Sequence, residues 1–134
     1  MSKLTRLQQL LYQTQAVTPS QFLQLLDQAN IQDIDGYLLF TGQTGCKQWL
    51  ENVDYLASSQ TVSRELIEKW QTEGDFQFIG QTIDGDYLVA TKVWVRVIPV
   101  SLYQSDIEKY QLNLADFFLR YLDGELPSQI LSMP

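Results

Sequence analysis

The strongest constraint on the fold is a change in hydrophobic spacing at Glu73-Gly74-Asp75. Before this point, apolar residues recur at intervals of three and four, which is typical of amphipathic helices. After it, they come in short runs rich in Val, Ile and aromatic side chains, which is typical of strands. Helices followed by consecutive strands favour an α+β domain with an antiparallel sheet.

Four segments combine helical spacing with helix-end signals. The first begins near Leu4 and ends near Gln15. The second runs from Thr18 to a predicted stop at Asn30, and the other two cover residues 62–71 and 113–122. The second helix has a predicted capping box, a proline at its first position and one apolar face, made of Thr18, Pro19, Gln21, Phe22, Leu25, Leu26 and Ala29.

The predicted strands are short. They cover residues 76–79, 87–90 and 93–98, and residues 37–40 form either a short buried strand or the core end of a loop. Asp84-Gly85, between the strands at 76–79 and 87–90, favours a hairpin with a type I′ turn, which has a two-residue loop. We therefore expect an antiparallel sheet of about three to five strands, packed with N-terminal, middle and C-terminal helices. Neither an internal repeat nor a linker interrupts the pattern, so residues 1–134 are predicted to form a single domain.

The stretch GQTGCK, residues 42–47, resembles a phosphate-binding loop because two glycines precede a lysine. A Walker loop needs four residues between its glycines and a hydroxyl residue after the lysine. Here two residues separate Gly42 from Gly45, and Gln48 follows Lys47. We predict a surface turn at this place. The residues beyond it can form a helix whose face comprises Trp49, Leu50, Val53 and Leu56.

Composition removes most catalytic chemistry. The chain has no histidine and one cysteine, Cys46. Histidine-based triads, Cys-His pairs, histidine metal ligands and cysteine zinc clusters are therefore excluded. A thiol enzyme would lack its usual base, so Cys46 is predicted to be a small structural thiol. We expect no catalytic residue, no metal site and no cofactor.

Charge indicates the kind of partner. The formal net charge is −7, and no apolar run approaches the roughly 20 residues that a membrane-spanning helix needs. Acidity disfavours direct binding to nucleic acid or anionic lipid and favours basic protein partners. The N-terminal leucines are interrupted by glutamines, unlike a signal-peptide core, so we expect a cytoplasmic protein. The sequence leaves the oligomeric state open.

Two pairs of aspartates stand beside glycines. Asp33 and Asp35 precede Gly36 in a pattern that begins like a calcium loop, but leucines follow where oxygen ligands belong. Asp84 and Asp86 flank Gly85 and could share a cation. Turn chemistry explains both pairs more simply, because aspartate favours turns for the hydrogen bonds of its side chain.

Trp94 is the aromatic residue most suited to a partner. It alternates with Val93, Val95 and Val97 and shares its strand face with Arg96. If the valines face the helices, Trp94 lies on the open side of the sheet, as a binding anchor would. Cover by the N-terminal helices or by the C-terminal tail is the alternative.

The segments ELIEKW, DFQFIGQTIDGDYLVAT, VWVRV and LNLADFFLRYLDGEL come in an order that resembles the SUKH superfamily. This family includes bacterial immunity proteins and a yeast regulator of cell-wall synthesis. The resemblance covers about residues 62–124. The first half has QDIDG where the family usually carries Leu-Pro, so the chain is expected to be a divergent member.

The resemblance implies a fold without catalytic residues and a protein that neutralises a toxin, often a nuclease, by binding it. Our leading hypothesis is therefore an immunity protein for a basic toxin domain. Two alternatives remain: a regulatory or scaffold protein of the same fold, and a small nucleotide- or metal-binding enzyme that uses Lys47. The candidate partner contacts are Asp84, Asp86, Trp94, Asp33 and Asp35.

Overall fold

The computed structural model describes the backbone of residues 3–13 and 18–132 and the side chains from residue 6 onward within these ranges. The predicted inward side chain of Leu4 and the predicted helix end near Gln15 lie outside them. Five described helices are α1 (Lys3–Gln13), α2 (Pro19–Gln28), α3 (Gly42–Tyr55), α4 (Arg64–Gln71) and α5 (Leu114–Leu122). The strands are β1 (Asp33–Ile34), β2 (Leu38–Leu39), β3 (Gln77–Thr82), β4 (Tyr87–Ala90), β5 (Val95–Ile98) and β6 (Glu108–Tyr110).

The strands form one antiparallel sheet whose order follows the chain, from β1 to β6. This confirms the α+β class, although six strands exceed the predicted three to five. The two additional strands are short. Asp33 and Ile34 pair with β2, and Glu108 to Tyr110 pair with β5. Neither strand has a long apolar run, so the sequence gives little sign of it. Each is defined by its pairing with the neighbouring strand.

The predicted helix ends are confirmed where a side chain binds the backbone. The Thr18 hydroxyl accepts a hydrogen bond from the Gln21 amide at 3.2 Å, and the Gln21 side chain completes the capping box. Asn113 caps α5 by accepting a hydrogen bond from the Asp116 amide at 2.9 Å. Asn30 follows the end of α2 with φ of 55°, a left-handed conformation that asparagine tolerates.

The turn between β3 and β4 differs from the predicted type. Between β3 and β4, the Gly85 amide donates to the Thr82 carbonyl and Gly85 alone has positive φ, 92°. This is a three-residue loop rather than the predicted two-residue one. Asp35 and Gly36 both have positive φ, as a type I′ turn requires, so that turn joins β1 to β2.

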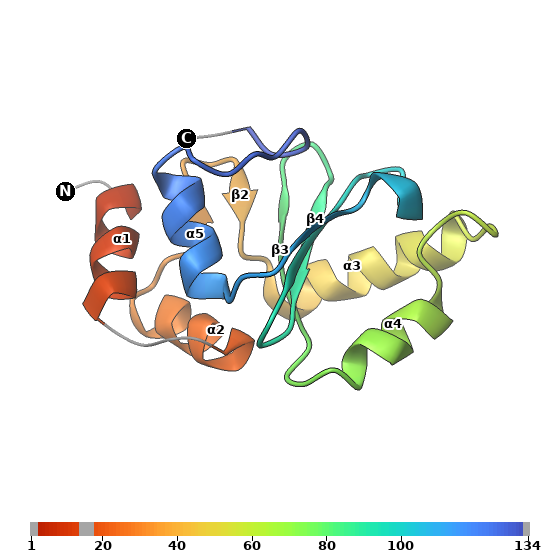
Figure 1. Cartoon of the computed structure of the whole chain (residues 1–134), viewed down its shortest axis with the longest axis horizontal. Helices are drawn as coiled ribbons and strands as arrows, with labels where there is room; N and C mark the ends of the chain where they lie inside the picture. The colour runs from red at the N-terminus through yellow and green to blue at the C-terminus, as the bar shows by residue number, and fades with distance from the viewer. Residues whose placement is uncertain (1–2, 14–17, 133–134) are drawn as a thin grey trace.

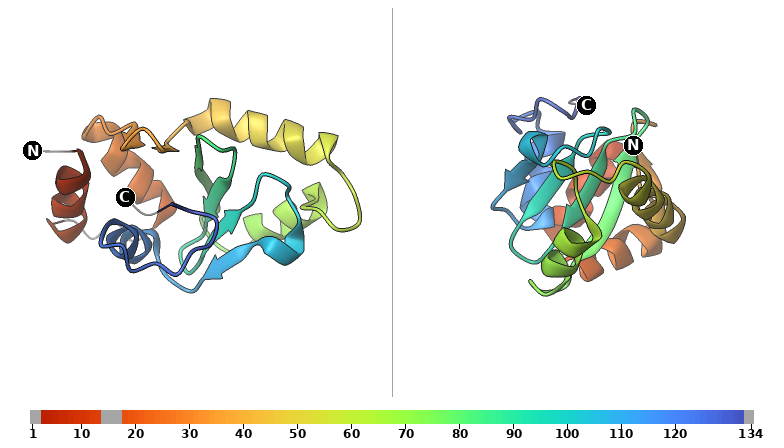
Figure 2. Two further views of the ribbon diagram at one scale, coloured as in Figure 1. Left: turned by 90° about the horizontal axis from the view of Figure 1, so that it is seen from above. Right: turned by 90° about the vertical axis from the view of Figure 1, so that its right-hand side faces the viewer.

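Helices cover both faces of the sheet, as Figure 1 shows with the strands between two groups of helices. Helices α1, α2 and α5 pack on one face, where Leu88, Val95 and Val97 are buried; we call this the first core. Helices α3 and α4 cover the other face, where Val89, Trp94 and Ile98 are buried; we call this the second core. The view from above in Figure 2 shows the same three layers.

The sheet needs one glycine for a close approach between strands. A Cβ atom added to Gly80 would lie 2.3 Å from the carbonyl oxygen of Leu39. That distance is far below van der Waals contact, so any side chain at this position would push β2 away from β3. Gly80 therefore allows β1 and β2 to join the sheet.

Candidate functional site

The two aspartate pairs lie at the same end of the sheet. Leu38 pairs with Thr82, which places the turn at Asp35 next to the turn at Asp84. The Ile83 amide donates to the Tyr37 carbonyl at 2.9 Å and so fixes one hairpin against the other. Residues that are far apart in the chain therefore form one acidic end of the molecule, at the top of the strands in Figure 1.

The four aspartates are not equally accessible. Asp35 and Asp84 are exposed, and Asp33 is half-buried, with its carboxylate accepting from the Gly36 amide at 2.7 Å. Ile83 precedes Asp84, and Val100 lies beside Gly85 of the same turn; their side chains are 64% and 55% exposed, respectively. We call Asp33, Asp35, Ile83, Asp84 and Val100 the hairpin end. It combines carboxylates with exposed apolar surface, which is the composition that a basic protein partner can bind.

Asp86 is buried and has a structural role. Its carboxylate accepts hydrogen bonds from the Thr82 hydroxyl at 3.1 Å and from the Val100 amide at 3.0 Å. Its own amide donates to the Thr82 hydroxyl. The carboxylate thus closes the β3–β4 turn and holds the chain that leaves β5. With 8% of its surface exposed, Asp86 presents little to a partner.

The prediction that Trp94 lies on an open face is wrong, because it is 2% exposed. The valines do face the first core, except the exposed Val93. The opposite face is closed by α4, and Trp70 and Phe76 make edge contacts with the Trp94 ring. Neither the N-terminal helices nor the tail provides this cover, so both predicted arrangements differ from the structure.

Arg96 completes the cover over Trp94. Its guanidinium carbon lies 3.9 Å from the Trp94 ring centre and 4.9 Å from the Trp70 ring centre. Burial lowers the pKa of the Arg96 guanidinium, and the negative charge of Glu73 acts in the opposite direction. Arg96 is therefore part of the second core, where its guanidinium group packs on the faces of two tryptophan rings.

The stretch GQTGCK forms the first turns of α3, so the prediction of a surface turn is wrong. Gly45 is buried in this helix, against Thr41 and Phe78. The predicted helical face beyond it is confirmed at Trp49 and Val53, which are buried in the second core. Leu50 is half-buried and Leu56 is 38% exposed, so the face ends before Leu56.

Cys46 and Lys47 line a hollow of about 430 Å³ on α3. Burial raises the pKa of the Cys46 thiol, and the positive charge of Arg64 only partly opposes this effect. A raised pKa reduces the fraction of thiolate, which is the reactive form. Arg64 itself binds Asp54 through two hydrogen bonds of 2.9 Å. The arrangement therefore does little to activate the cysteine.

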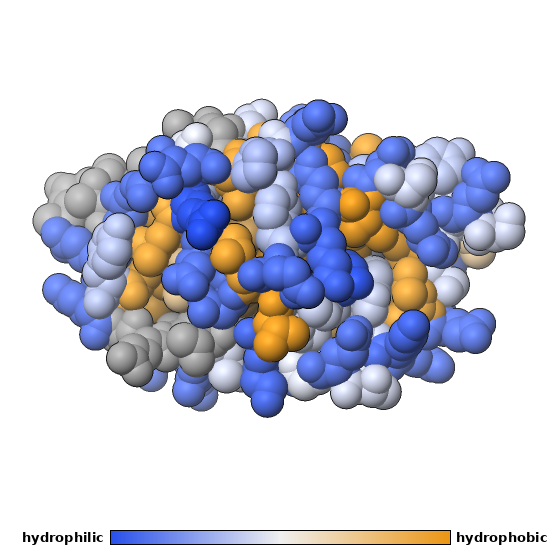
Figure 3. All heavy atoms as spheres, in the orientation of Figure 1, coloured by the Kyte–Doolittle hydropathy of each residue, from blue (hydrophilic) through white to orange (hydrophobic). Residues whose placement is uncertain are grey.

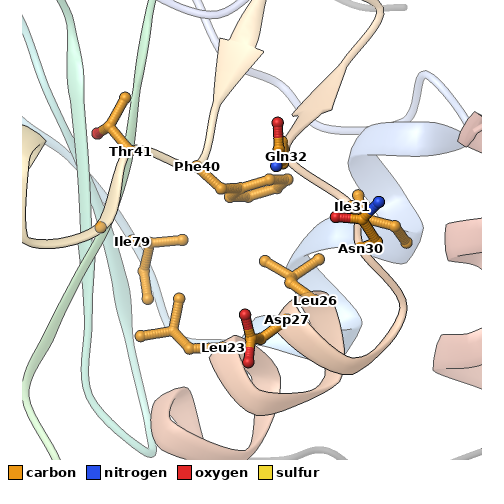
Figure 4. Close-up of a pocket in the computed structure, with 10 residues that line it drawn as sticks. Leu23, Leu26, Asp27, Asn30, Ile31, Gln32, Phe40, Thr41 and Ile79 are labelled. Atoms are coloured by element: carbon orange, nitrogen blue, oxygen red, sulfur yellow. The ribbon is translucent and has the colours of Figure 1, made fainter.

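A larger hollow, of about 530 Å³, lies between α2, the β1–β2 hairpin and the start of α3 (Figure 4). Apolar side chains from α2, from the residue after β2 and from β3 converge on it, with polar side chains around them. A second hollow, of about 340 Å³, adjoins it and shares Leu23 and Asp27. We call the two together the α2 groove. Its described lining residues are Ser20, Leu23, Gln24, Leu26, Asp27, Asn30, Ile31, Gln32, Phe40, Thr41, Gly42, Gln77 and Ile79.

The sequence contains one signal for the α2 groove that our interpretation missed. Leu23 is apolar but lies outside the predicted inward stripe of the second helix. An apolar residue beside such a stripe is either exposed or covered by another element, and here it forms a wall of the groove. Figure 3, in the orientation of Figure 1, shows apolar residues as separate patches among polar ones.

Neither a metal centre nor a membrane span is found within the described ranges. No group of three or more carboxylates or thiols among these residues is arranged to hold a metal ion. No helix among them is both long and apolar enough to cross a bilayer. Comparison with protein-family models, curated proteins and solved structures gives no match to this chain.

Proposed function

We propose that this chain is a non-catalytic, protein-binding domain of the cytoplasm that neutralises a basic toxin domain by binding it directly. The resemblance of residues 62–124 to SUKH proteins suggests this role. The observation that carries it is the hairpin end, where exposed Asp35 and Asp84 lie beside exposed Ile83 and Val100. A toxin that handles phosphates has a basic active site, which these carboxylates would complement.

Charge and apolar contacts have different tasks in this proposal. The net charge of −7 steers the encounter with a cationic partner over long range. Ile83 and Val100 supply apolar surface that loses contact with water once the partner is docked. The revised contact set is therefore Asp33, Asp35, Ile83, Asp84 and Val100, while Asp86 and Trp94 act through folding.

The direct test is co-expression of the chain with the toxin domain encoded beside its gene. Wild-type protein should restore growth. The double variant Asp35→Asn, Asp84→Asn should bind the purified toxin domain at least about tenfold more weakly. Asparagine tolerates the positive φ at position 35, so this variant should fold normally.

A charge-matched control is available outside the hairpin end. Glu51 and Glu68 are exposed on α3 and α4, and Glu51→Gln with Glu68→Gln removes the same two charges. This control should bind nearly as wild type does. Survival that does not depend on the chain, for every neighbouring toxin tried, contradicts the proposed function.

A further inference from the structure

The α2 groove combines an apolar floor with a polar rim, and its chemistry is specific. Its floor is apolar, since Leu26, Ile31 and Ile79 are buried in the first core and also line the groove. The larger of its two hollows has a volume of about 530 Å³, within the range of roughly 300–1,000 Å³ that is common for binding sites. Leu23 and Phe40 are half-buried at its walls, so apolar surface remains available to a ligand.

The groove also has a definite charge. Asp27 is the one ionisable side chain among its described lining residues. Asp27 is exposed on the last turn of α2, and no described residue forms an ion pair with it. Its carboxylate lies near the carbonyl end of the helix dipole, which is also negative. Both sources of charge favour a cation at this edge of the groove.

We infer that the α2 groove binds a basic peptide segment of a protein partner, with a large apolar side chain in the hollow and a Lys or Arg at Asp27. The inference rests on the proposed function for the identity of the partner. An apolar floor with a single carboxylate fits such a segment. An acidic segment would meet repulsion from both Asp27 and the net charge of the chain.

Polar groups on the rim can orient the segment. The side chains of Asn30 and Gln32 lie at the rim opposite Ile79 and Leu23, as Figure 4 shows. An amide side chain can both donate to and accept from a peptide backbone. Apolar anchoring in the hollow and polar pairing at the rim are the usual division of roles in a specific binding site.

Two substitutions test the inference and leave the fold intact. Asp27→Asn removes the charge of an exposed residue at the end of α2. Leu23→Trp fills the hollow from its wall. The control Gln28→Lys makes the same change in net charge as Asp27→Asn, at an exposed neighbour that does not line the groove. The thermal unfolding midpoint of each purified variant should stay close to that of wild type.

The first measurement uses a random displayed peptide library selected against the full chain. We expect selected peptides with a large apolar residue close to Lys or Arg. Their affinity should fall at least about tenfold for Leu23→Trp and about three- to tenfold for Asp27→Asn, with little change for Gln28→Lys. Equal binding to wild type and Leu23→Trp overturns the inference, as does failure to select any peptide. Selection of uncharged apolar or acidic peptides overturns it as well.

The second measurement separates this inference from the proposed function. The same variants are co-expressed with the neighbouring toxin domain. Weaker protection by Leu23→Trp and Asp27→Asn than by Gln28→Lys supports the α2 groove as the toxin contact. Full protection by all three variants would show that the α2 groove does not contact the toxin. The proposed function would still hold in that case. Peptide binding without any protection by wild type supports the groove and contradicts the immunity function.

Discussion

Asp84 and Asp86 stand two residues apart in one turn and have different roles. Asp84 is exposed, whereas Asp86 is buried and binds the Thr82 hydroxyl and the Val100 amide. The Thr82 hydroxyl is buried, so water cannot readily replace the Asp86 carboxylate as its hydrogen-bond acceptor. Stability should therefore depend on Asp86, while Asp84 remains available to a partner.

We expect Asp86→Ala to lower the free energy of unfolding by about 2 kcal/mol, because it removes the acceptor of the buried Thr82 hydroxyl and of the Val100 amide. Urea denaturation followed by tryptophan fluorescence measures this loss. The control Asp84→Ala changes an exposed side chain and should alter stability by less than about 0.5 kcal/mol. Equal losses in the two variants would show that Asp86 is not a structural carboxylate.

Arg96 gives a second prediction for a single side chain. Arg96→Ala should lower the free energy of unfolding by about 1–2 kcal/mol, because it removes a cation from two tryptophan faces and uncovers the Trp94 ring. Water would then reach Trp94, and its fluorescence emission should shift to the red. The matched control is Lys109→Ala, an exposed cation opposite Arg96 on β6. An unshifted emission spectrum for Arg96→Ala would count against the stacked arrangement.

At the scale of elements, α2 is held at its beginning by a carboxylate from a distant segment. Asp75, which precedes β3, accepts hydrogen bonds from the Ser20 amide at 2.9 Å and from the Ser20 hydroxyl. Burial alone would raise the pKa of Asp75, but the hydrogen bonds from Ser20 and Gln77 and the charge of Lys92 together lower it. The contact also agrees with the helix dipole, which favours an anion at this end.

The lowered pKa of Asp75 predicts a pH dependence. A carboxylate whose pKa is lower in the folded state stabilises the fold above its unfolded pKa, and this contribution is lost as the pH falls through the folded value. We expect Asp75→Asn to be about 1 kcal/mol less stable than wild type near neutral pH. The difference should shrink below about pH 4. Urea unfolding at the two pH values measures it, and a constant difference would contradict the assignment.

At the scale of the whole molecule, two cores share one sheet. In β4, Leu88 is buried in the first core and the next residue, Val89, is buried in the second. All three tryptophans of the chain, Trp49, Trp70 and Trp94, lie in the second core. Tryptophan fluorescence therefore reports directly on one core, while the strands between the cores couple it to the other.

This arrangement predicts cooperative unfolding. Leu88→Ala should lower the free energy of unfolding by about 2–5 kcal/mol through a cavity in the first core. Tryptophan fluorescence should nevertheless detect the full loss, and its transition should coincide with that of far-ultraviolet circular dichroism. Ile83→Ala changes an exposed side chain and serves as the control; it should change the free energy of unfolding little. Separate transitions for the two probes would show that the cores unfold independently.

Much of the fold was predictable because its signals are local. The capping box at Thr18, the cap at Asn113 and the strands on either side of Gly85 depend on residues close in sequence. The first turn of α3 was not predictable in the same way, since two glycines at its start favour a turn. Burial of Gly45 and Trp49 against β3 stabilises the helix despite this propensity.

The sequence by itself determined that the chain has no histidine, one cysteine and a net charge of −7, because composition does not depend on folding. It also determined which residues of β5 share a face, because side chains alternate along a strand. Only the tertiary structure decided that α4 covers Trp94, that the turns at Asp35 and Asp84 meet, and that Leu23 lines a groove. These outcomes depend on contacts between segments far apart in the chain, and alternation on a strand does not say which helix covers which face.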